Sequence, residues 1–132
     1  MSKPAMYIFI NKGLNMSVGK SCSQAAHAAV EAFRMSKIDM VQKWYEGKHH
    51  MKLVMQARDE NHLQNIQDYL AKRGFYSEMI IDEGLTEIDS IVKTALGVEI
   101  VDKEDPHTIA TFSTFELYRD KIRISMEIDK SD

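Results

Sequence analysis

The side chains best suited to chemistry gather in residues 13–28, which follow an apolar run at 6–10 and open a segment with helical spacing. Lys20 stands at that junction with the hydroxyls of Ser17 and Ser21. The first turn of a helix presents unpaired backbone N–H groups and a partial positive charge, so a lysine and hydroxyls there can bind a phosphate or stabilise an oxyanion. A turn with an ordinary serine N-cap would use the same residues, and this stretch alone leaves both interpretations open.

One interpretation is a nucleotide-binding P-loop, because Gly19, Lys20 and Ser21 end the stretch as that motif does. The motif places four residues between its two glycines, whereas five separate Gly13 from Gly19. Among the acidic residues that end later apolar runs, Asp82 is the best placed to hold the required magnesium. The glycine spacing ranks this interpretation last.

A second interpretation rests on residues further into the same segment. The loop 16–20, Met-Ser-Val-Gly-Lys, followed by Gln24, His27 and Ala28, resembles the archaeal and eukaryotic type of peptidyl-tRNA hydrolase, whose Met-Gly-Lys-Gly-Lys loop leads into a Gln-x-x-His-Ala helix. The resemblance continues in the family's order through Gly47 with Lys-Leu-Val at 52–54, Asp-Glu-Gly-Leu-Thr at 82–86 and Thr-Ala-Leu-Gly at 94–97. It covers residues 7–98, most of the chain.

This resemblance implies an ester hydrolase that releases free tRNA and peptide from peptidyl-tRNA without a metal or an organic cofactor. The catalytic residues that the resemblance implies are Lys20, Asp82, Thr86 and Thr94, with Gln24 and His27 nearby. We expect Ser17, Gln24, His27 and Lys52 to bind the substrate. Water attack on the ester builds negative charge on the carbonyl oxygen, and a lysine at a helix N-terminus can stabilise that charge. Asp82 could hold Lys20 in place or orient the water, and the sequence leaves both roles open.

Three positions depart from the family pattern. Val18 replaces a loop lysine, Gln56 stands where the family carries another lysine, and Glu99 follows Gly97 and Val98 where the family has Gly-Pro. Each change removes positive charge or alters loop geometry. A non-enzymatic member of the same fold that binds tRNA or a protein is therefore the alternative to the hydrolase.

Other conspicuous side chains have ordinary structural explanations. On an alanine-rich helix face, His27 is typical of a packed core histidine as well as of a proton-transfer residue, and the four other histidines form no metal-ligand pattern. Trp44, Tyr45 and the nine methionines are expected in the core. Lys48 and Lys52 could reach phosphates, or could form a solvated edge.

The composition predicts one domain of ordinary size. The chain has 132 residues, 44% of them hydrophobic, and a formal net charge of -3. Its one cysteine cannot form an internal disulfide, and no apolar run approaches the roughly 20 residues that span a bilayer, so we expect a cytoplasmic protein with no membrane partner. Residues 1–56 carry eight Lys or Arg and three Asp or Glu (+5), and the remainder carries nine and seventeen (-8). A fold that gathers the first half on one face would be locally basic, which tRNA binding favours.

The hydrophobic pattern predicts the elements that position these residues. We expect strands over 6–11, 51–57, 75–82 and 91–100, the first buried on both faces, and helices over 20–35, over 38–45 and from a cap at Asp59 to a stop at Gly74. The inward face of the first helix is predicted to hold Cys22, Ala25, Ala26, Ala29 and Phe33. The order of elements predicts an α/β fold, a single three-layer α/β/α domain with a mixed, mostly parallel sheet of about four strands.

We expect this domain to span residues 1–120 and a C-terminal extension to occupy 121–132. Apolar residues at 122, 124, 126 and 128 alternate with polar ones, the period of a half-buried strand. Such a strand would extend the sheet at an edge or pair with a second copy, so a homodimer is one expected assembly. Functional residues collect beyond the carboxyl ends of parallel strands, where we expect both the Gly13 loop and Asp82 to emerge.

Overall fold

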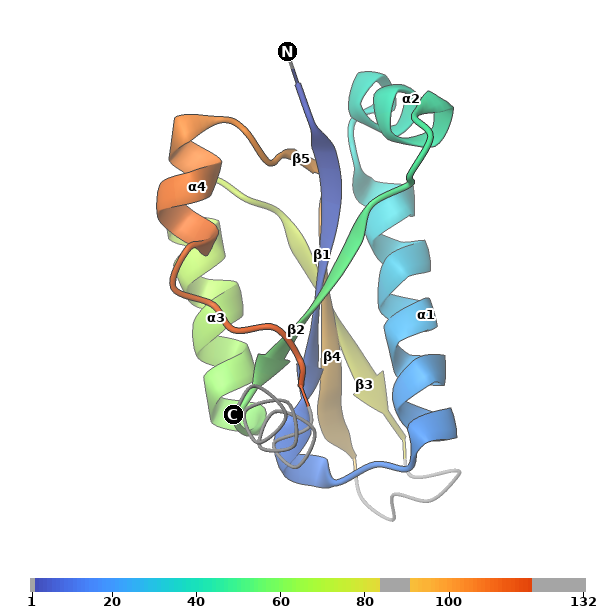
Figure 1. The fold of residues 1–132 in the computed structure, drawn as a ribbon. Coiled ribbons are helices and arrows are strands. Elements are labelled where there is room, and N and C mark those ends of the chain that lie inside the picture. The colour runs from blue at the N-terminus through green and yellow to red at the C-terminus, as the bar shows by residue number, and fades with distance from the viewer. Residues whose placement is uncertain (1, 84–90, 120–132) are drawn as a thin grey trace, which may run out of the picture.

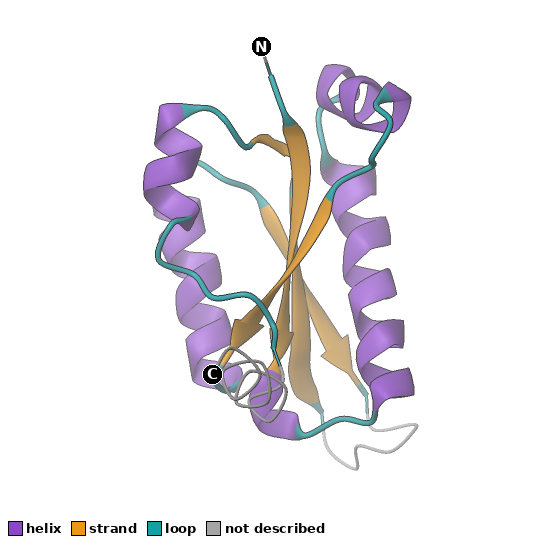
Figure 2. Cartoon of the chain, viewed as in Figure 1, coloured by secondary structure: helices purple, strands orange, loops and turns teal. Residues whose placement is uncertain are grey.

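Up to residue 98, strands and helices follow one another in the order that the hydrophobic pattern predicts, and a short strand and a helix that it did not predict come after them (Figure 1; Figure 2). The structure is a computed structural model and describes residues 2–83 and 91–119. The strands are β1 (Pro4–Asn11), β2 (Lys52–Ala57), β3 (Ser77–Asp82), β4 (Val92–Val98) and β5 (Val101–Asp102). The helices are α1 (Val18–Met35), α2 (Ile38–Glu46), α3 (Glu60–Lys72) and α4 (Pro106–Phe112), with a 3-10 turn η1 (Lys12–Leu14). Thr86 and the predicted strand within 121–132 lie outside the described residues.

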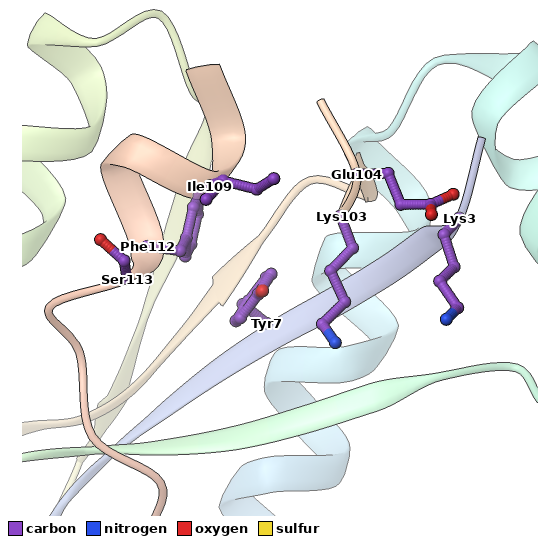
Figure 3. Close-up of a pocket in the computed structure, with 7 residues that line it drawn as sticks. All are labelled: Lys3, Tyr7, Lys103, Glu104, Ile109, Phe112 and Ser113. Carbon is purple, nitrogen blue, oxygen red and sulfur yellow. The ribbon is translucent and has the colours of Figure 1, made fainter. Parts of the chain in front are cut away.

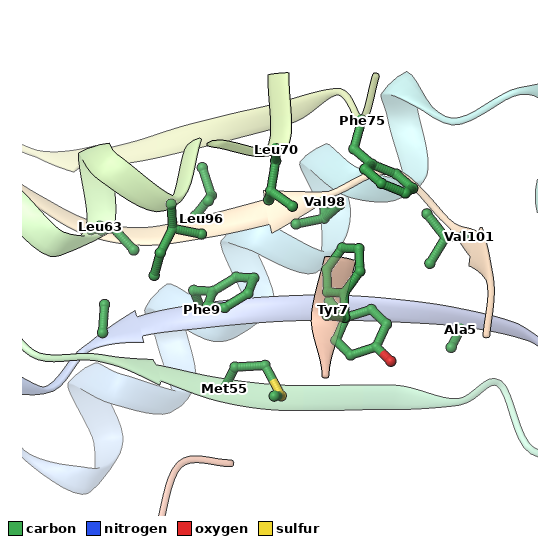
Figure 4. Close-up of a cluster of buried hydrophobic side chains, with 13 residues drawn as sticks. Ala5, Tyr7, Phe9, Met55, Leu63, Leu70, Phe75, Leu96, Val98 and Val101 are labelled. Carbon is green, nitrogen blue, oxygen red and sulfur yellow. The ribbon is translucent and has the colours of Figure 1, made fainter. Parts of the chain in front are cut away.

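The helices cover both faces of the sheet, so the predicted three-layer α/β/α arrangement is confirmed. Helices α1 and α2 lie on one face and α3 and α4 on the other (Figure 1). Strand β1 is buried on both: Met6 and Ile8 pack under α1, while Tyr7 and Phe9 belong to the cluster under α3 that Figure 4 shows. None of the helices within the described ranges has the length and apolar character that a membrane crossing needs.

The sheet has the strand order β2-β1-β4-β3, with β5 paired to the start of β1. The sheet is mixed, as predicted, but it is not mostly parallel, because only one of these described pairs, β1 with β2, is parallel. The reason lies in the connection between β3 and β4. The segment 83–91 is shorter than the dozen or more residues that a parallel crossover needs, so β4 returns antiparallel beside β3. β1, β2 and β3 still run in the same direction.

The predicted helix boundaries are set by side-chain and backbone capping bonds. The carboxylate of Asp59 accepts a hydrogen bond from the backbone N–H of His62 at 2.7 Å, which confirms it as the N-cap of α3. At the C-terminal end of α2, Gly47 is the capping residue, and its backbone N–H donates to the carbonyl oxygen of Lys43 at 3.2 Å. In α2, Trp44 is buried as predicted, but Tyr45 is 63% exposed and does not belong to the core.

The buried face of α1 differs from the prediction. Gln24, Ala28 and Ala32 face the sheet, whereas Cys22 and Phe33 are exposed. The cause is a close approach of the helix to β4 at Gly97, where an added Cβ would lie 2.2 Å from the carbonyl oxygen of Ala28. This contact fixes which side of α1 turns inward, and it carries a polar residue, Gln24, into the interior.

Candidate active site

The carboxyl ends of β1 and β3 and the first turn of α1 meet at one end of the molecule (Figure 1). The chain leaves β1 through η1 and reaches α1, whose N-cap is Ser17. The Ser17 hydroxyl oxygen accepts a hydrogen bond from the backbone N–H of Lys20 at 3.1 Å. The cap therefore fixes the backbone of Lys20 in the first turn, where the helix dipole is positive.

Lys20 and Asp82 form an ion pair across this end of the sheet. Lys20 Nζ lies 3.3 Å from Asp82 Oδ2, and their side chains are 10% and 8% exposed. Removal from water strengthens the attraction between the two charges, although burying them costs solvation. An ammonium carries three N–H donors, so Lys20 can hold the carboxylate and also donate to an oxygen of a bound substrate. The structure thus brings together the two residues on which the predicted chemistry depends.

The side chain of Thr94 on β4 contacts α1 because of an irregularity in the sheet. Ile80 pairs with Ala95 but Ile81 pairs with Lys93, so Thr94 is an extra residue in β4. A β-bulge of this kind redirects a side chain, and the fully buried hydroxyl of Thr94 donates to the side-chain oxygen of Gln24 on α1. It also lies 3.3 Å from the carbonyl oxygen of Ile80. The bulge therefore ties β4 to the helix that carries Lys20.

Replacing Thr94 by valine, which has nearly the same shape, should destabilise the protein by about 1–3 kcal/mol, because the buried Gln24 oxygen loses its donor. Thr94→Ser is the matched control, since it keeps the hydroxyl and removes one methyl group, worth about 0.8 kcal/mol. Urea denaturation measures both. A valine variant as stable as the serine variant would show that the hydroxyl does not hold this junction.

Asn11 is a further buried polar residue here, and the sequence analysis treated it only as the end of a strand. It is 2% exposed, its side-chain Nδ2 donates to the carbonyl oxygen of Lys93 at 2.9 Å, and its Oδ1 accepts from the Gly13 N–H at 3.1 Å. Asn11 thus connects the β4 bulge to the loop before α1. A polar side chain ending an otherwise apolar central strand was the available signal.

The other implied site residues are more dispersed. His27 lies on α1 two turns beyond Lys20, about 10 Å along the helix, and it is exposed rather than packed in the core. Lys52 lies at the opposite end of the sheet, where it begins β2. Thr86 falls outside the described residues. Within the described ranges, His, Cys, Asp and Glu side chains form no group of three that could hold a metal.

The positions that depart from the family pattern have separate explanations. Val18 is 82% exposed in the first turn of α1. Beside Gln56, a lysine is supplied by another element, because Lys12 Nζ lies 3.4 Å from the Gln56 side-chain oxygen. Glu99 is buried, and its carboxylate accepts a hydrogen bond from the backbone N–H of Tyr76 at 2.6 Å. It therefore links the residue just before β3 to the residue just after β4.

A cavity of about 460 Å³ lies at the end of the sheet opposite Lys20 and Asp82. Figure 3 shows Tyr7 and Phe112 as two of the residues that line it, with Lys3 and Lys103 nearer the start of β1. Burial raises the pKa of the Tyr7 hydroxyl, which keeps the phenol neutral. None of the implied site residues within 2–83 and 91–119 lines this cavity.

Comparison with known proteins agrees with the resemblance. Residues 4–112 match the family described as Peptidyl-tRNA hydrolase PTH2. A peptidyl-tRNA hydrolase of Thermococcus onnurineus is 36% identical over 107 residues, which cover 74% of this chain and 89% of that protein. A peptidyl-tRNA hydrolase of Thermoplasma acidophilum is 34% identical over 97 residues, 70% of this chain and 81% of the relative.

A mammalian relative, the mitochondrial peptidyl-tRNA hydrolase 2 of Mus musculus, is 30% identical over 109 residues, 77% of this chain and 60% of the relative. The match along most of the chain leaves the P-loop interpretation without support, because it accounts for Gly19, Lys20 and Ser21 in another way. The chain belongs to the PTH2 family of peptidyl-tRNA hydrolases, and peptidyl-tRNA hydrolysis is the activity that this membership assigns to it.

Proposed function

We propose that the Lys20–Asp82 pair is the catalytic centre that hydrolyses the ester between the peptide and the terminal ribose of tRNA. The observation that carries the proposal is the 3.3 Å ion pair at the first turn of α1, nearly closed to solvent, in a chain of this family. A buried cation beside a helix N-terminus is suited to a reaction that develops negative charge on oxygen.

In the proposed reaction, the water oxygen bonds to the ester carbonyl carbon, and the bond from that carbon to the ribose oxygen breaks. The ribose oxygen takes up the proton that the water loses, so the tRNA leaves with a free hydroxyl and the peptide with a carboxyl group. Lys20 donates to the carbonyl oxygen as it becomes an oxyanion. Asp82 holds the ammonium and orients the attacking water. Gln24 and Thr94 are positioning residues in this proposal, because their hydrogen bond fixes α1, which carries Lys20, against β4.

Thr86 and His27 complete the proposed site. Thr86 would offer a hydroxyl to the water or to the terminal ribose, as the family resemblance implies. His27 and Ser17 would contact the substrate, since both are exposed, Ser17 at the N-cap of α1 and His27 two turns beyond Lys20. No metal or organic cofactor takes part in the proposed reaction.

The direct test is an assay of purified protein with peptidyl-tRNA that follows peptide release and tRNA binding separately. We expect multiple turnovers at catalytic amounts of protein. Salt-dependent binding without release would support the non-enzymatic alternative instead. Neither binding nor release at micromolar protein would contradict the proposal.

The homodimer and the cytoplasmic setting are further proposals. Apolar side chains on α1 and α2 are exposed, with Val30 at 63% and Ile38 at 86%, and such a surface is typical of protein contacts. Two copies could associate there or through residues 121–132. A mass measurement in solution, with and without 121–132, distinguishes the two routes from a monomer.

A further inference from the structure

The corner between α2 and β2, residues 43–52, is the most basic stretch of the chain that the structure describes. It holds three lysines and two histidines against one glutamate, in a protein whose net charge is -3. Figure 1 shows this corner at the end of the molecule opposite the start of α1. Its distance from the proposed catalytic pair means that the reaction itself does not explain its charge.

The corner is an ordered structure and not a loose run of lysines. The His50 ring stacks on Tyr45 with centroids 5.3 Å apart, and His50 Nε2 donates to the Tyr45 carbonyl oxygen at 2.6 Å. Lys52 Nζ donates to the His50 carbonyl oxygen at 2.9 Å and lies 5.0 Å from the Trp44 ring centre. These contacts hold His50 in the left-handed conformation, at φ 43°, that turns the chain into β2. The intervening residues 48 and 49 are exposed.

A groove of about 430 Å³ runs beside this corner to the start of β1. Lys3, Lys43 and Lys48 line it together with both histidines of the corner, and Glu46 is its single acidic residue. An anionic ligand in this groove would therefore lie beside several positively charged side chains on an ordered part of the backbone. Prior ordering of a binding surface lowers the entropy lost on association.

Among the residues that the structure describes, the end that carries the catalytic pair has no comparable excess of positive charge. The elements and loops that meet there hold the basic residues Lys12, Lys20, Arg58, Lys93 and Arg119 and the acidic residues Asp59, Glu60, Asp82, Glu83 and Glu116. Affinity for RNA comes largely from lysine and arginine that displace counterions from phosphates. A balanced surface supplies little of that affinity, so a substrate as large as tRNA needs contacts elsewhere.

We propose that the surface formed by Lys3, Lys43, Lys48 and His49 binds the sugar-phosphate backbone of the tRNA whose 3′ end lies at Lys20. This proposal rests on the proposed function. The proposed surface and the catalytic pair lie at opposite ends of β1, whose Pro4 lines the groove and whose Asn11 leads toward α1. These ends are seven residues apart, about 23 Å at 3.3 Å per residue. At the axial rise of about 3.4 Å per nucleotide in one strand of a duplex, roughly seven nucleotides span that length. The surface is within reach of the chain that enters the site.

The test is the double variant Lys43→Gln/Lys48→Gln, which removes two charges and keeps Lys52, the lysine that packs on Trp44. We expect KM for peptidyl-tRNA to rise at least about tenfold at physiological salt, with kcat retained. The slope of log KM against log salt should fall by roughly 1.4 to 1.8, from the two lost phosphate contacts. Lys72→Gln, an exposed lysine at the end of α3 on the other face of the sheet, is the control for Lys48→Gln and should change neither quantity.

A short substrate separates this proposal from the proposed function. A peptide esterified to adenosine alone cannot reach the corner, so the double variant should hydrolyse it as the unchanged protein does. Failure of the unchanged protein to cleave either substrate would count against the catalytic proposal. If the unchanged protein cleaves tRNA esters and the double variant has the same KM and salt slope as the unchanged protein, the surface does not bind tRNA. An acidic protein would then be the remaining candidate partner for this surface.

Discussion

Replacing Lys20 by methionine should lower kcat for peptidyl-tRNA hydrolysis by about 10²–10³-fold, the typical effect of losing one oxyanion donor. Methionine keeps the length and most of the volume of the side chain but supplies no charge and no donor. The variant should also lose about 3 kcal/mol of stability, because the buried carboxylate of Asp82 is left without its cation. Steady-state kinetics at a temperature where circular dichroism shows folded protein measures the first effect, and urea denaturation the second.

Lys72→Met is the control for this experiment, because Lys72 is an exposed lysine at the far end of α3. It should leave both kcat and stability nearly unchanged. A Lys20→Met protein that is folded and turns over at the rate of the control would contradict the role given to the ammonium.

Replacing Gly97 by alanine should destabilise the protein by about 3 kcal/mol or more, because the added Cβ would lie 2.2 Å from the carbonyl oxygen and 3.0 Å from the carbonyl carbon of Ala28. These are backbone atoms inside α1, so the helix itself has to move away from β4. Movement of α1 also carries Lys20 away from Asp82 and breaks the contact of Gln24 with Thr94. Activity should therefore fall together with stability, and chemical denaturation with a matched activity assay measures both.

Gly19→Ala provides the matched control for this substitution. A Cβ at Gly19, in the first turn of α1, would have no heavy atom within 4 Å. Alanine there should stabilise the protein by about 0.4–1 kcal/mol, by restricting the unfolded chain. Equal stability of the two alanine variants would mean that α1 does not pack on β4 as closely as the structure shows.

Much of the fold was predictable because local patterns and tertiary packing agree. The apolar run that became β1 is long enough for a strand and has no polar face, which is the pattern of a strand covered on both sides. Helix α3 combines a cap at Asp59, an apolar stripe at Leu63, Ile66 and Leu70, and a stop at Gly74. For both elements the local sequence signals were sufficient, because they agree with one another and fit no other secondary structure.

The parts that could not be predicted depend on pairs of elements. The period of two along β4 gives no sign that Thr94 is an extra residue, because the bulge exists only in its register against β3. The rotation of α1 depends on the approach of Ala28 to Gly97 and not on hydrophobicity alone. The pattern of apolar residues therefore selected a face that is only partly right: Ala25 and Ala29 pack against the core, while Cys22 and Phe33 are exposed. The antiparallel direction of β4 was predictable, because the short connection between the two predicted strands already excludes a parallel crossover.

The candidate site was predictable where residue types were chemically specific and close in sequence. Ser17, Lys20 and Gln24 share one helix, so their spacing alone placed them together. Asp82 lies far away in the chain, and two arguments linked it to the loop of Lys20: both were expected to emerge at the carboxyl ends of strands, and both match the motifs of a known family. Asn11 was missed because its task, joining the β4 bulge to the loop after β1, has no signature in the sequence.

The most direct test of the catalytic pair is a double-mutant cycle of Lys20→Met and Asp82→Asn, measured as kcat and as unfolding free energy in the same preparations. If the two side chains act as one unit, the double variant should be about as slow as the slower single variant and should recover stability that Lys20→Met loses, because no buried charge remains unpaired. Effects on kcat that simply multiply, or single variants as active as the unchanged protein, would show that this ion pair is not the centre of the reaction.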